Sequence, residues 1–566
     1  MAATRTYLFP ESGKIAENIK NDAFLRYRLE TVKSVGDELK KTPASQLKYS
    51  EFKIFYETGS RQEYELSYFA HRKRLNTFAL LALIYGGEYV SCLEDAIWAV
   101  LDEYTWALPA HISRDENVSE RITHIDLFAS ETGFTLAEIL RLTGGMLSPE
   151  VTERAELEIR RRIIEPYLSG RENSWDKIEN NWSAVCAGSV GAAFLYLAED
   201  AEINCALPRI LKTLECYLAG FGFDGASVEG MNYWHYGFGY FVYFASLLKD
   251  YNGTDLFDNE KVKNIALFQQ KMRLKNNKTP SFSDGSGTFD HISGLTHFLK
   301  TRYDEIIIPD DSCAQSVYGD ACFRFAPFIR NFAWRNTAFE TKSAPESGCS
   351  YFEDAAWYIK TAGKYDFAAK AGMNDESHNH VDIGAFLINA DGKSIISDPG
   401  RGEYTAGYFG PERYTYFAPS AHAHSIPVIN GRIQCAGREF YGRVLKADDK
   451  TLSMELAPAY DDEKLKSLVR SFEFLENGVR INDSFSFSGD GNAVTEHFVT
   501  EVRPEAADGG VRLGGAFLKT DAAPEFKEIT FETGHGKKTV WTVDFVFENL
   551  GSDAELSFLV SEEAEK

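Results

Sequence analysis

The sequence has no surplus of basic residues. Its 566 residues include 60 Lys and Arg against 84 Asp and Glu, which gives a formal net charge of −24. Binding to nucleic acid or to an anionic membrane depends on a basic face, so we expect neither as a partner. A small anionic ligand in a locally basic cleft remains compatible with this charge.

Cysteine motifs and long apolar segments are also missing. The eight cysteines are scattered and none stands in a CxxC pair, so we interpret them as buried or free thiols, which fits a reducing compartment. The first residues, MAATRTYLFPESGK, contain no apolar run of signal-peptide length, and no segment reaches membrane-spanning length. We expect a cytoplasmic protein, or a periplasmic or secreted one if a signal segment has been removed.

Aromatic residues, in contrast, are abundant. They make up 14% of the chain, with 28 Tyr and 41 Phe. Such a content suits clefts that stack sugar rings, and it equally suits a large aromatic core. Because 566 residues exceed one ordinary core, we expect two large domains.

The two halves of the chain differ in periodicity. Up to about residue 305, apolar residues recur at helical spacing, and helices are predicted within 76–104 (a pair joined by Gly-Gly), 183–199 and 238–251. After about residue 320 the period is two, and strand pairs are predicted at 442–458, 469–489 and 537–550. The predicted fold class is a multidomain α+β chain, with an all-α array that could close into a toroid (1–310) and an antiparallel β-sandwich or stacked sheets (311–566).

Histidines concentrate in the strand-rich half, where four of the twelve lie between His378 and His424. Alternation along an expected strand, HNHVD, puts His378, His380 and Asp382 on one face. Asp398 follows the ADGK hairpin turn, and His424 is expected to open another strand. Two histidines and a carboxylate can form a three-ligand metal site; the alternative is a hydrogen-bonded network that holds the sheet together.

The helical half has two polar clusters. Asn180, Asn181 and Trp182 precede the small-residue helix at 183–199, where an Asn can cap the first turn or take part in catalysis. In the next cluster Glu229 precedes a tyrosine stripe at helical spacing, made of Tyr233, Tyr236, Tyr240 and Tyr243. Such a stripe usually packs in a core, but its polar neighbours make an aromatic cleft credible.

The motifs NNW (180–182), DGxxxEGxxYWxY (224–236), HxHxD (378–382), SDPG (397–400) and AHSIPVING (423–431) occur in an order that resembles the heparinase II/III-like polysaccharide lyases. The resemblance implies an incomplete (α/α) toroid followed by antiparallel β-sheets, with an active site between them. It also implies β-elimination on chains that contain uronic acid.

The resemblance further implies roles for single residues. Asn181 resembles the group that neutralises the substrate carboxylate, Tyr233 resembles the catalytic tyrosine, and His378 resembles the active-site histidine of the β-domain. The residues that match metal ligands of the family are His380, Asp398 and His424, which would hold one structural divalent ion, zinc in the family. Residues expected to contact the substrate are Trp106, His111, Asn180, Trp182, Glu229, Tyr236, Tyr408 and Arg413.

One departure from the family pattern bears on the substrate. Trp182 stands where many alginate-acting relatives have histidine, so a base from that position is missing and proton abstraction falls to Tyr233 or His378. We therefore expect a lyase that acts on a glycosaminoglycan such as hyaluronan, chondroitin or heparan sulfate. The alternatives are an oligoalginate lyase, a carbohydrate-binding homologue without activity, and a hydrolase with paired carboxylates.

Overall fold

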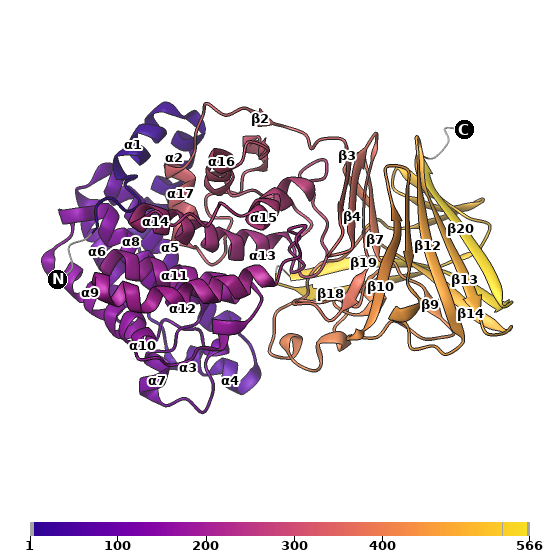
Figure 1. Ribbon diagram of the computed structural model, residues 1–566, viewed down its shortest axis with the longest axis horizontal. Helices are drawn as coiled ribbons and strands as arrows, with labels where there is room; N and C mark the ends of the chain where they lie inside the picture. Colours follow the sequence, from indigo (N-terminus) through magenta and orange to yellow (C-terminus); the bar gives the residue numbers. More distant parts are fainter. Residues whose placement is uncertain (1–4, 535, 563–566) are drawn as a thin grey trace. The chain divides into compact units, whose positions relative to one another are not determined.

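The computed structural model describes residues 5–534 and 536–562, with most helices in the indigo to magenta part of the chain and most strands in the orange to yellow part (Figure 1). The α-helices are α1 (Ser12–Asn21), α2 (Ala23–Leu39), α3 (Tyr49–Phe52), α4 (Ile54–Thr58), α5 (Gln62–Tyr85), α6 (Glu88–Leu101), α7 (Val118–Ile122), α8 (Leu127–Thr143), α9 (Pro149–Ile159), α10 (Glu165–Leu168), α11 (Asn181–Leu197), α12 (Asp200–Ala219), α13 (Met231–Tyr233), α14 (Gly239–Asn252), α15 (Glu260–Lys271), α16 (Ser293–Arg302) and α17 (Phe325–Ala333).

The strands follow in the second half of the chain. They are β1 (Ile308–Pro309), β2 (Thr341–Lys342), β3 (Gly348–Phe352), β4 (Trp357–Ala362), β5 (Tyr365–Lys370), β6 (Gly372–Asn374), β7 (Phe386–Ala390), β8 (Lys393–Ile396), β9 (Val428–Ile429), β10 (Gly437–Ala447), β11 (Thr451–Glu455), β12 (Leu465–Leu475), β13 (Gly478–Phe487), β14 (Asn492–Thr500), β15 (Glu505–Ala507), β16 (Gly510–Leu513), β17 (Ala516–Lys519), β18 (Pro524–Thr533), β19 (Gly536–Leu550) and β20 (Asp553–Glu562).

Packing divides the chain into two compact units. The helical unit consists of the chain up to Phe221 together with Tyr233–Ala266 and Asp290–Ser343, and the β unit consists of Gly222–Asn232, Leu267–Phe289 and the chain from Ala344 onward. The predicted division into 1–310 and 311–566 is a single cut along the sequence, whereas the packing units interleave. That division stays a prediction about domains.

The helical unit forms as the apolar periodicity predicts. Gly86 and Gly87, both with left-handed φ (58° and 57°), join α5 to α6. Small residues in α11 let α14 approach closely, because a Cβ at Gly188 would lie 2.9 Å from the Tyr240 carbonyl oxygen. Within the described ranges every helix is too short or too polar to span a membrane.

The β unit contains three antiparallel sheets among the described residues. Their strand orders are β15-β16-β17-β20-β13-β12-β11-β10-β6, β18-β19-β14-β9 and β3-β4-β5-β7-β8. The predicted strand pairs at 442–458 and 469–489 are the hairpins β10–β11 and β12–β13. The third prediction is wrong, because residues 537–550 form one long strand, β19, that pairs with β18 and β14.

One aromatic core joins these sheets. The rings of Phe367 (β5) and Phe386 (β7) contact Phe472 (β12) at centroid distances of 4.7 and 4.9 Å. Phe386 also contacts Phe498 (β14) at 6.2 Å, and Phe498 contacts Phe558 (β20) at 5.0 Å. Part of the aromatic content therefore serves core packing, the second of the two roles expected for the abundant aromatic residues.

The two early segments of the β unit are held by polar contacts. In the first segment, Asp224 and Asp354 each accept a hydrogen bond from the other's backbone N–H, at 2.8 and 3.2 Å. In the second, Lys275 pairs with Asp366 at 3.1 Å, and Ser281 Oγ donates to the Asp398 carbonyl at 2.9 Å. The second segment thereby reaches the region of the histidine cluster.

Candidate active site and metal centre

The HNHVD segment does not form the expected strand. Strand β6 ends at Asn374 and β7 begins at Phe386, so His378, His380 and Asp382 lie in the loop between them. His378 has φ 59°, a left-handed conformation that no strand residue adopts. The alternation argument for a shared strand face was therefore wrong, although the loop still brings two histidines together.

Antiparallel pairing explains why residues distant in sequence meet here. Strands β7 and β8 form a hairpin through the ADGK turn, as predicted, so the residue stretches before β7 and after β8 lie at the same end. His380 precedes β7, and Asp398 follows β8. The segment with His424 comes from the stretch before β9.

Arg470, on β12, hydrogen-bonds to the two chain segments that carry His380 and His424. Its guanidinium is fully buried and donates to the backbone carbonyls of Gly384 (3.1 Å) and Ser425 (2.7 Å), next to the histidine-bearing stretches. The buried carboxylates of Asp483 and Glu496 balance its charge.

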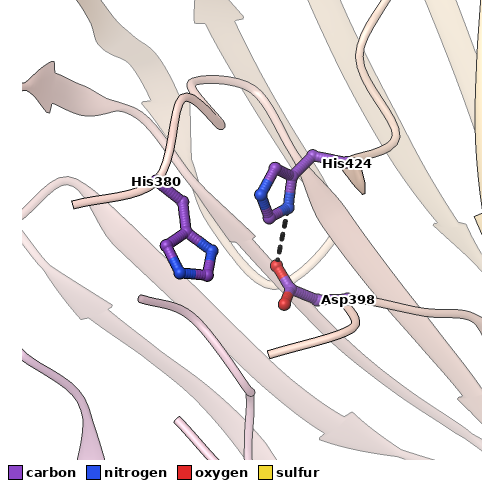
Figure 2. A group of neighbouring side chains, drawn as sticks. All are labelled: His380, Asp398 and His424. Carbon is purple, nitrogen blue, oxygen red and sulfur yellow. Dashed lines mark hydrogen bonds and ion pairs between the residues drawn. The ribbon is translucent and has the colours of Figure 1, made fainter. Parts of the chain in front are cut away.

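Figure 2 shows His380, Asp398 and His424 turned toward one another. One ligand atom from each residue lies within 4.8 Å of the others, and all three side chains are buried. His424 Nδ1 lies 3.1 Å from Asp398 Oδ2. The predicted set of metal ligands thus forms a buried group that could hold a metal ion.

The hydrogen bonding of the two histidines fits a cation. His380 Nε2 contacts Asp284, whereas its Nδ1 is buried and has no hydrogen-bond partner among residues 5–534 and 536–562. His424 Nε2 donates to the Ala418 carbonyl at 3.1 Å, so in a neutral ring the lone pair of Nδ1 faces the Asp398 carboxylate. Two acceptors at that distance need a proton or a metal between them.

If His424 is protonated, the cluster can instead be the hydrogen-bonded network that the sequence left open as the alternative to a metal site. Burial disfavours the charged ring, but Asp398 outweighs it and raises the pKa of His424. Burial lowers the pKa of His380 against the opposing effect of Asp284. An ion pair between His424 and Asp398 would satisfy those two residues, but within the described part of the chain it leaves His380 Nδ1 without a partner, which favours the metal.

Asp284, which the sequence did not single out, is the carboxylate at the centre of this region. It is fully buried and lies 2.6 Å from His378 Nδ1 and 3.1 Å from His380 Nε2. Burial alone would raise its pKa, but the hydrogen bonds from His378 and His380 hold the pKa of Asp284 well below its usual range. The Gly- and Ser-rich stretch SFSDGSG signals a turn at this position, but only the fold places it beside the histidines.

Tyr408 and Arg413 complete the surroundings of Asp284. Tyr408 is buried and its hydroxyl donates to Asp284 at 2.9 Å, while Arg413 Nη2 lies 3.3 Å from the same carboxylate. The guanidinium of Arg413 also covers the Tyr408 ring, 4.5 Å from its centroid. Both residues, predicted to contact the substrate, here support Asp284; their role in binding stays a prediction.

The His378 ring remains partly accessible. Its Nε2 lies 3.8 Å from Glu229, whose carboxylate also accepts a hydrogen bond from Ser377 at 3.0 Å. The exposed Phe409 meets the His378 ring edge-on at 6.1 Å. Glu229, predicted from the DGxxxEG motif, thus belongs to the β unit and lies beside His378.

Asp382 forms a buried ion pair apart from the candidate metal ligands. It pairs with Lys370 at 2.7 Å, and both side chains are fully buried. Burial raises the pKa of the neighbouring Glu376 to about 7, against the opposing charge of Lys370. Asp382 therefore lies outside the group that could hold a metal.

The NNW motif begins helix α11 in the helical unit. Asn180 caps the helix by accepting from Trp182 N–H at 3.1 Å, so the capping alternative is correct for Asn180. Asn181 is buried. The Trp182 ring packs edge-on against His111 at 4.8 Å, and His111 Nδ1 lies 2.7 Å from Asp126. His111 and Trp182, both expected to contact the substrate, thus lie in contact with each other; their role in binding stays a prediction.

The tyrosine stripe is interrupted by a π-helical turn, Trp234–Phe238, between α13 and α14. Tyr233 lies before this turn, whereas Tyr236 and Tyr240 both donate to the buried carboxylate of Glu131, Tyr240 at 3.0 Å. Arg324 lies over the Tyr236 ring at 3.9 Å and pairs with Glu131 at 3.3 Å. Sequence reasoning did not single out Glu131 and Arg324, because they are distant in sequence from the tyrosines and only the fold brings them together.

Trp106 lies in the core of the helical unit with 1% of its surface exposed. Its indole N–H donates to the Val100 carbonyl at 3.0 Å, and Arg162 covers its ring. This burial favours a packing role for Trp106, and its contact with a substrate stays a prediction.

Comparison with known proteins adds to this geometry. Residues 344–551 match the family model described as Heparinase II/III-like, C-terminal. No curated protein matches the sequence. The match contains His378, His380, Asp398 and His424, but not Asp284, which comes from the earlier part of the chain.

Solved structures resemble nearly the whole chain. A heparinase III with methylated lysines has a TM-score of 0.61 at 13% identity, covering 88% of this chain and 78% of its own. The heparan sulfate lyase HepC from Pedobacter heparinus has a TM-score of 0.56 at 15% identity, covering 88% and 77%. A chondroitin AC lyase from Streptomyces coelicolor A3, in complex with chondroitin sulphate, has a TM-score of 0.54 at 10% identity, covering 98% and 80%.

These likenesses confirm the predicted fold class, a helical toroid followed by antiparallel sheets. At sequence identities this low, the structural likenesses show the fold alone. The resemblance to the heparinase II/III-like family is confirmed: residues 344–551 match the model of that family's C-terminal domain, and most of the chain resembles solved heparinase III and heparan sulfate lyase structures in fold.

Proposed function

We propose that the protein is a polysaccharide lyase that cleaves a glycosaminoglycan containing uronic acid by β-elimination. The observation that carries the proposal is His378, which is partly accessible, held in a left-handed backbone conformation and bonded to the buried Asp284. Non-glycine residues in such conformations concentrate at functional sites, because the surrounding structure must stabilise them. This histidine belongs to the domain that matches the heparinase II/III-like family.

The reaction requires three roles. A base removes the proton at C5, which is only weakly acidic; its electron pair forms the C4–C5 double bond; and the C4–O4 bond breaks as an acid protonates O4. The charge that develops on the C5 carboxylate must be met by fixed donors. We assign the neutralising role to Asn181, acid or base catalysis to Tyr233, and a second acid–base role to His378.

We further propose that the buried His380–Asp398–His424 group holds one structural zinc ion. Two imidazoles and one carboxylate are a common zinc donor set, and no described residue hydrogen-bonds to His380 Nδ1. Bound there, the ion would join three chain segments close to His378 and keep their geometry. His380 would bind through Nδ1, because Asp284 accepts from its Nε2.

A glycosaminoglycan is preferred over alginate because of Trp182. Its ring packs against His111, which is itself fixed by Asp126, so this position offers an aromatic face instead of a base. Aromatic faces suit the stacking of pyranose rings. We therefore propose hyaluronan, chondroitin or heparan sulfate as the substrate class.

The test is an assay of the purified protein against a panel of uronate polymers that includes alginate. Ultraviolet absorbance reports the 4,5-unsaturated product, and a reducing-end assay reports every cleavage. We expect both signals to rise together on a glycosaminoglycan. Reducing ends without the absorbance would indicate hydrolysis, activity on alginate alone would indicate an oligoalginate lyase, and binding without cleavage would indicate a carbohydrate-binding homologue.

The role of Tyr233 is tested by Tyr233→Phe, with Tyr27→Phe as the control, because Tyr27 is 73% exposed on α2. Loss of the phenolic proton is expected to reduce kcat about 100-fold or more while substrate binding is retained. Full activity of Tyr233→Phe would remove Tyr233 from the proposed mechanism.

A further inference from the structure

Asp284 accepts hydrogen bonds from an unusual number of side chains for one buried carboxylate. Its Oδ2 lies 2.6 Å from His378 Nδ1, and its Oδ1 lies 3.1 Å from His380 Nε2 and 2.9 Å from Tyr408 Oη. Arg413 Nη2 contacts both oxygens, at 3.3 and 3.4 Å. Because a carboxylate bonded to a guanidinium only accepts, both histidine nitrogens that face Asp284 carry the proton.

The backbone at both ends of the Asp284–His378 bond is strained. Ser283 has φ 58° and His378 has φ 59°, conformations that cost a non-glycine residue about 1–3 kcal/mol each. Ser283 Oγ donates to the Val228 carbonyl at 2.8 Å. Gly400 packs so closely that an added Cβ would lie 2.5 Å from the Gly285 carbonyl oxygen. The backbone on both sides of Asp284 is therefore constrained by its packing.

We propose that Asp284 is a positioning residue that fixes the tautomer of His378 with the proton on Nδ1, and that of His380 with the proton on Nε2. The ring of His378 then presents the lone pair of Nε2 on the side away from Asp284. The ring of His380 presents the lone pair of Nδ1 to Asp398 and His424. The Asp284 carboxylate thus leaves one histidine nitrogen, Nε2 of His378, unprotonated for the reaction. It leaves a second nitrogen, Nδ1 of His380, unprotonated for the metal.

This role rests on the proposed lyase function only where it concerns His378 in catalysis. Carboxylates that orient a catalytic histidine change kcat by large factors when replaced by the isosteric amide, because the amide favours the wrong tautomer. Carboxylates that orient a metal-bound histidine change metal affinity about 10- to 100-fold. Asp284 lies where a single substitution should produce both effects.

The first experiment needs no substrate and no variant of Asp284. Nitrogen-15 spectra of the wild-type protein labelled in histidine, with the His378 signals assigned by their loss in His378→Gln, report which ring nitrogen carries the proton. We expect the Nδ1–H tautomer for His378. The Nε2–H tautomer in the wild-type protein would overturn the proposal.

The second experiment compares Asp284→Asn with Asp366→Asn. Asp366 is the matched control, because it is also a fully buried carboxylate of the β unit and pairs with Lys275. Only Asp284→Asn is expected to shift the His378 tautomer signals, and only it should weaken binding of Co²⁺, followed by its visible absorption, by about 10- to 100-fold. Unchanged spectra and unchanged Co²⁺ affinity in Asp284→Asn would refute the role.

Kinetics supply the third measurement. With an active substrate from the uronate panel, Asp284→Asn should lower kcat about 100-fold or more, with KM changed less than about threefold. A rise in KM with unchanged kcat would contradict a positioning role. If the protein cleaves no uronate polymer, the lyase proposal fails, whereas the spectra and the Co²⁺ titration still decide the role of Asp284.

Discussion

Replacing Arg470 with methionine is expected to destabilise the β unit far more than the same change at Arg480. Arg470 is fully buried and bonds to the carboxylates of Asp483 (2.9 Å) and Glu496 (3.2 Å) and to two backbone carbonyls. Removing one partner of a buried ion pair costs about 3–5 kcal/mol, because the remaining charge is left uncompensated. Arg480, whose side chain is 44% exposed, pairs with Glu473 at 3.4 Å, and such surface pairs contribute about 0–1 kcal/mol.

The size of the effect should depend on pH. Burial, and then the nearby Asp483, raise the pKa of Glu496 well above its usual range. Without Arg470 a protonated Glu496 leaves less uncompensated negative charge in mild acid, so the loss should be smaller at pH 5 than at pH 8. For a unit of this size 1 kcal/mol corresponds to about 2–4 °C in Tm, so a decrease of about 6–20 °C is expected.

Differential scanning calorimetry of Arg470→Met, Arg480→Met and the wild-type protein measures this difference. A second measurement is the affinity for Co²⁺, which should fall in Arg470→Met because Arg470 joins the chain segments that carry the two histidines. If Arg470→Met unfolds at the same temperature as Arg480→Met at pH 8, the buried ionic group does not stabilise the unit and the reasoning is refuted.

Three further predictions concern single side chains. Burial raises the pKa of Glu376 from 4.5 to about 7 in the folded chain. The protonated carboxyl of Glu376 therefore contributes its full stability below pH 4.5, and this contribution is lost as the pH rises to about 7. Glu376→Gln should raise the free energy of unfolding at pH 8 by up to about 3 kcal/mol and leave it unchanged at pH 4, as measured in urea titrations. His424→Ala should abolish stoichiometric metal in elemental analysis of protein purified without chelator, whereas the exposed His422→Ala should retain it; equal metal content in both would return the cluster to a hydrogen-bonded network. Phe409→Ala, beside His378, should raise KM about 2- to 10-fold with little change in kcat, unlike Phe526→Ala on β18, and equal KM values would exclude stacking at Phe409.

The sequence predicted the elements whose pattern is local. The helix pair around Gly86 and Gly87, the small-residue helix α11 and the hairpins β10–β11 and β12–β13 all follow from periodicity and turn residues. The ADGK hairpin likewise placed Asp398 near His380. Each of these depends on neighbours within about 30 residues, where periodicity is informative.

Two kinds of feature could not be predicted in this way. The left-handed backbone of His378 and the π-turn at Trp234–Phe238 break the alternation and the helical stripe on which the predictions depended. Asp284 could not be found because its partners are distant in sequence and its own surroundings, SFSDGSG, are those of an ordinary turn. Tertiary contacts alone give this aspartate its importance.

The interleaved β unit limits how the gene can be divided. A fragment encoding residues 344–551, the stretch that matches the family model, would carry His378 and the three metal-binding candidates but neither Glu229 nor Asp284. The same holds for a chimera that joins this C-terminal stretch to the first 343 residues of a distant relative, unless the relative supplies an equivalent aspartate. Recombination at the apparent domain border would therefore separate a histidine from the carboxylate that orients it, and the two segments must be exchanged together.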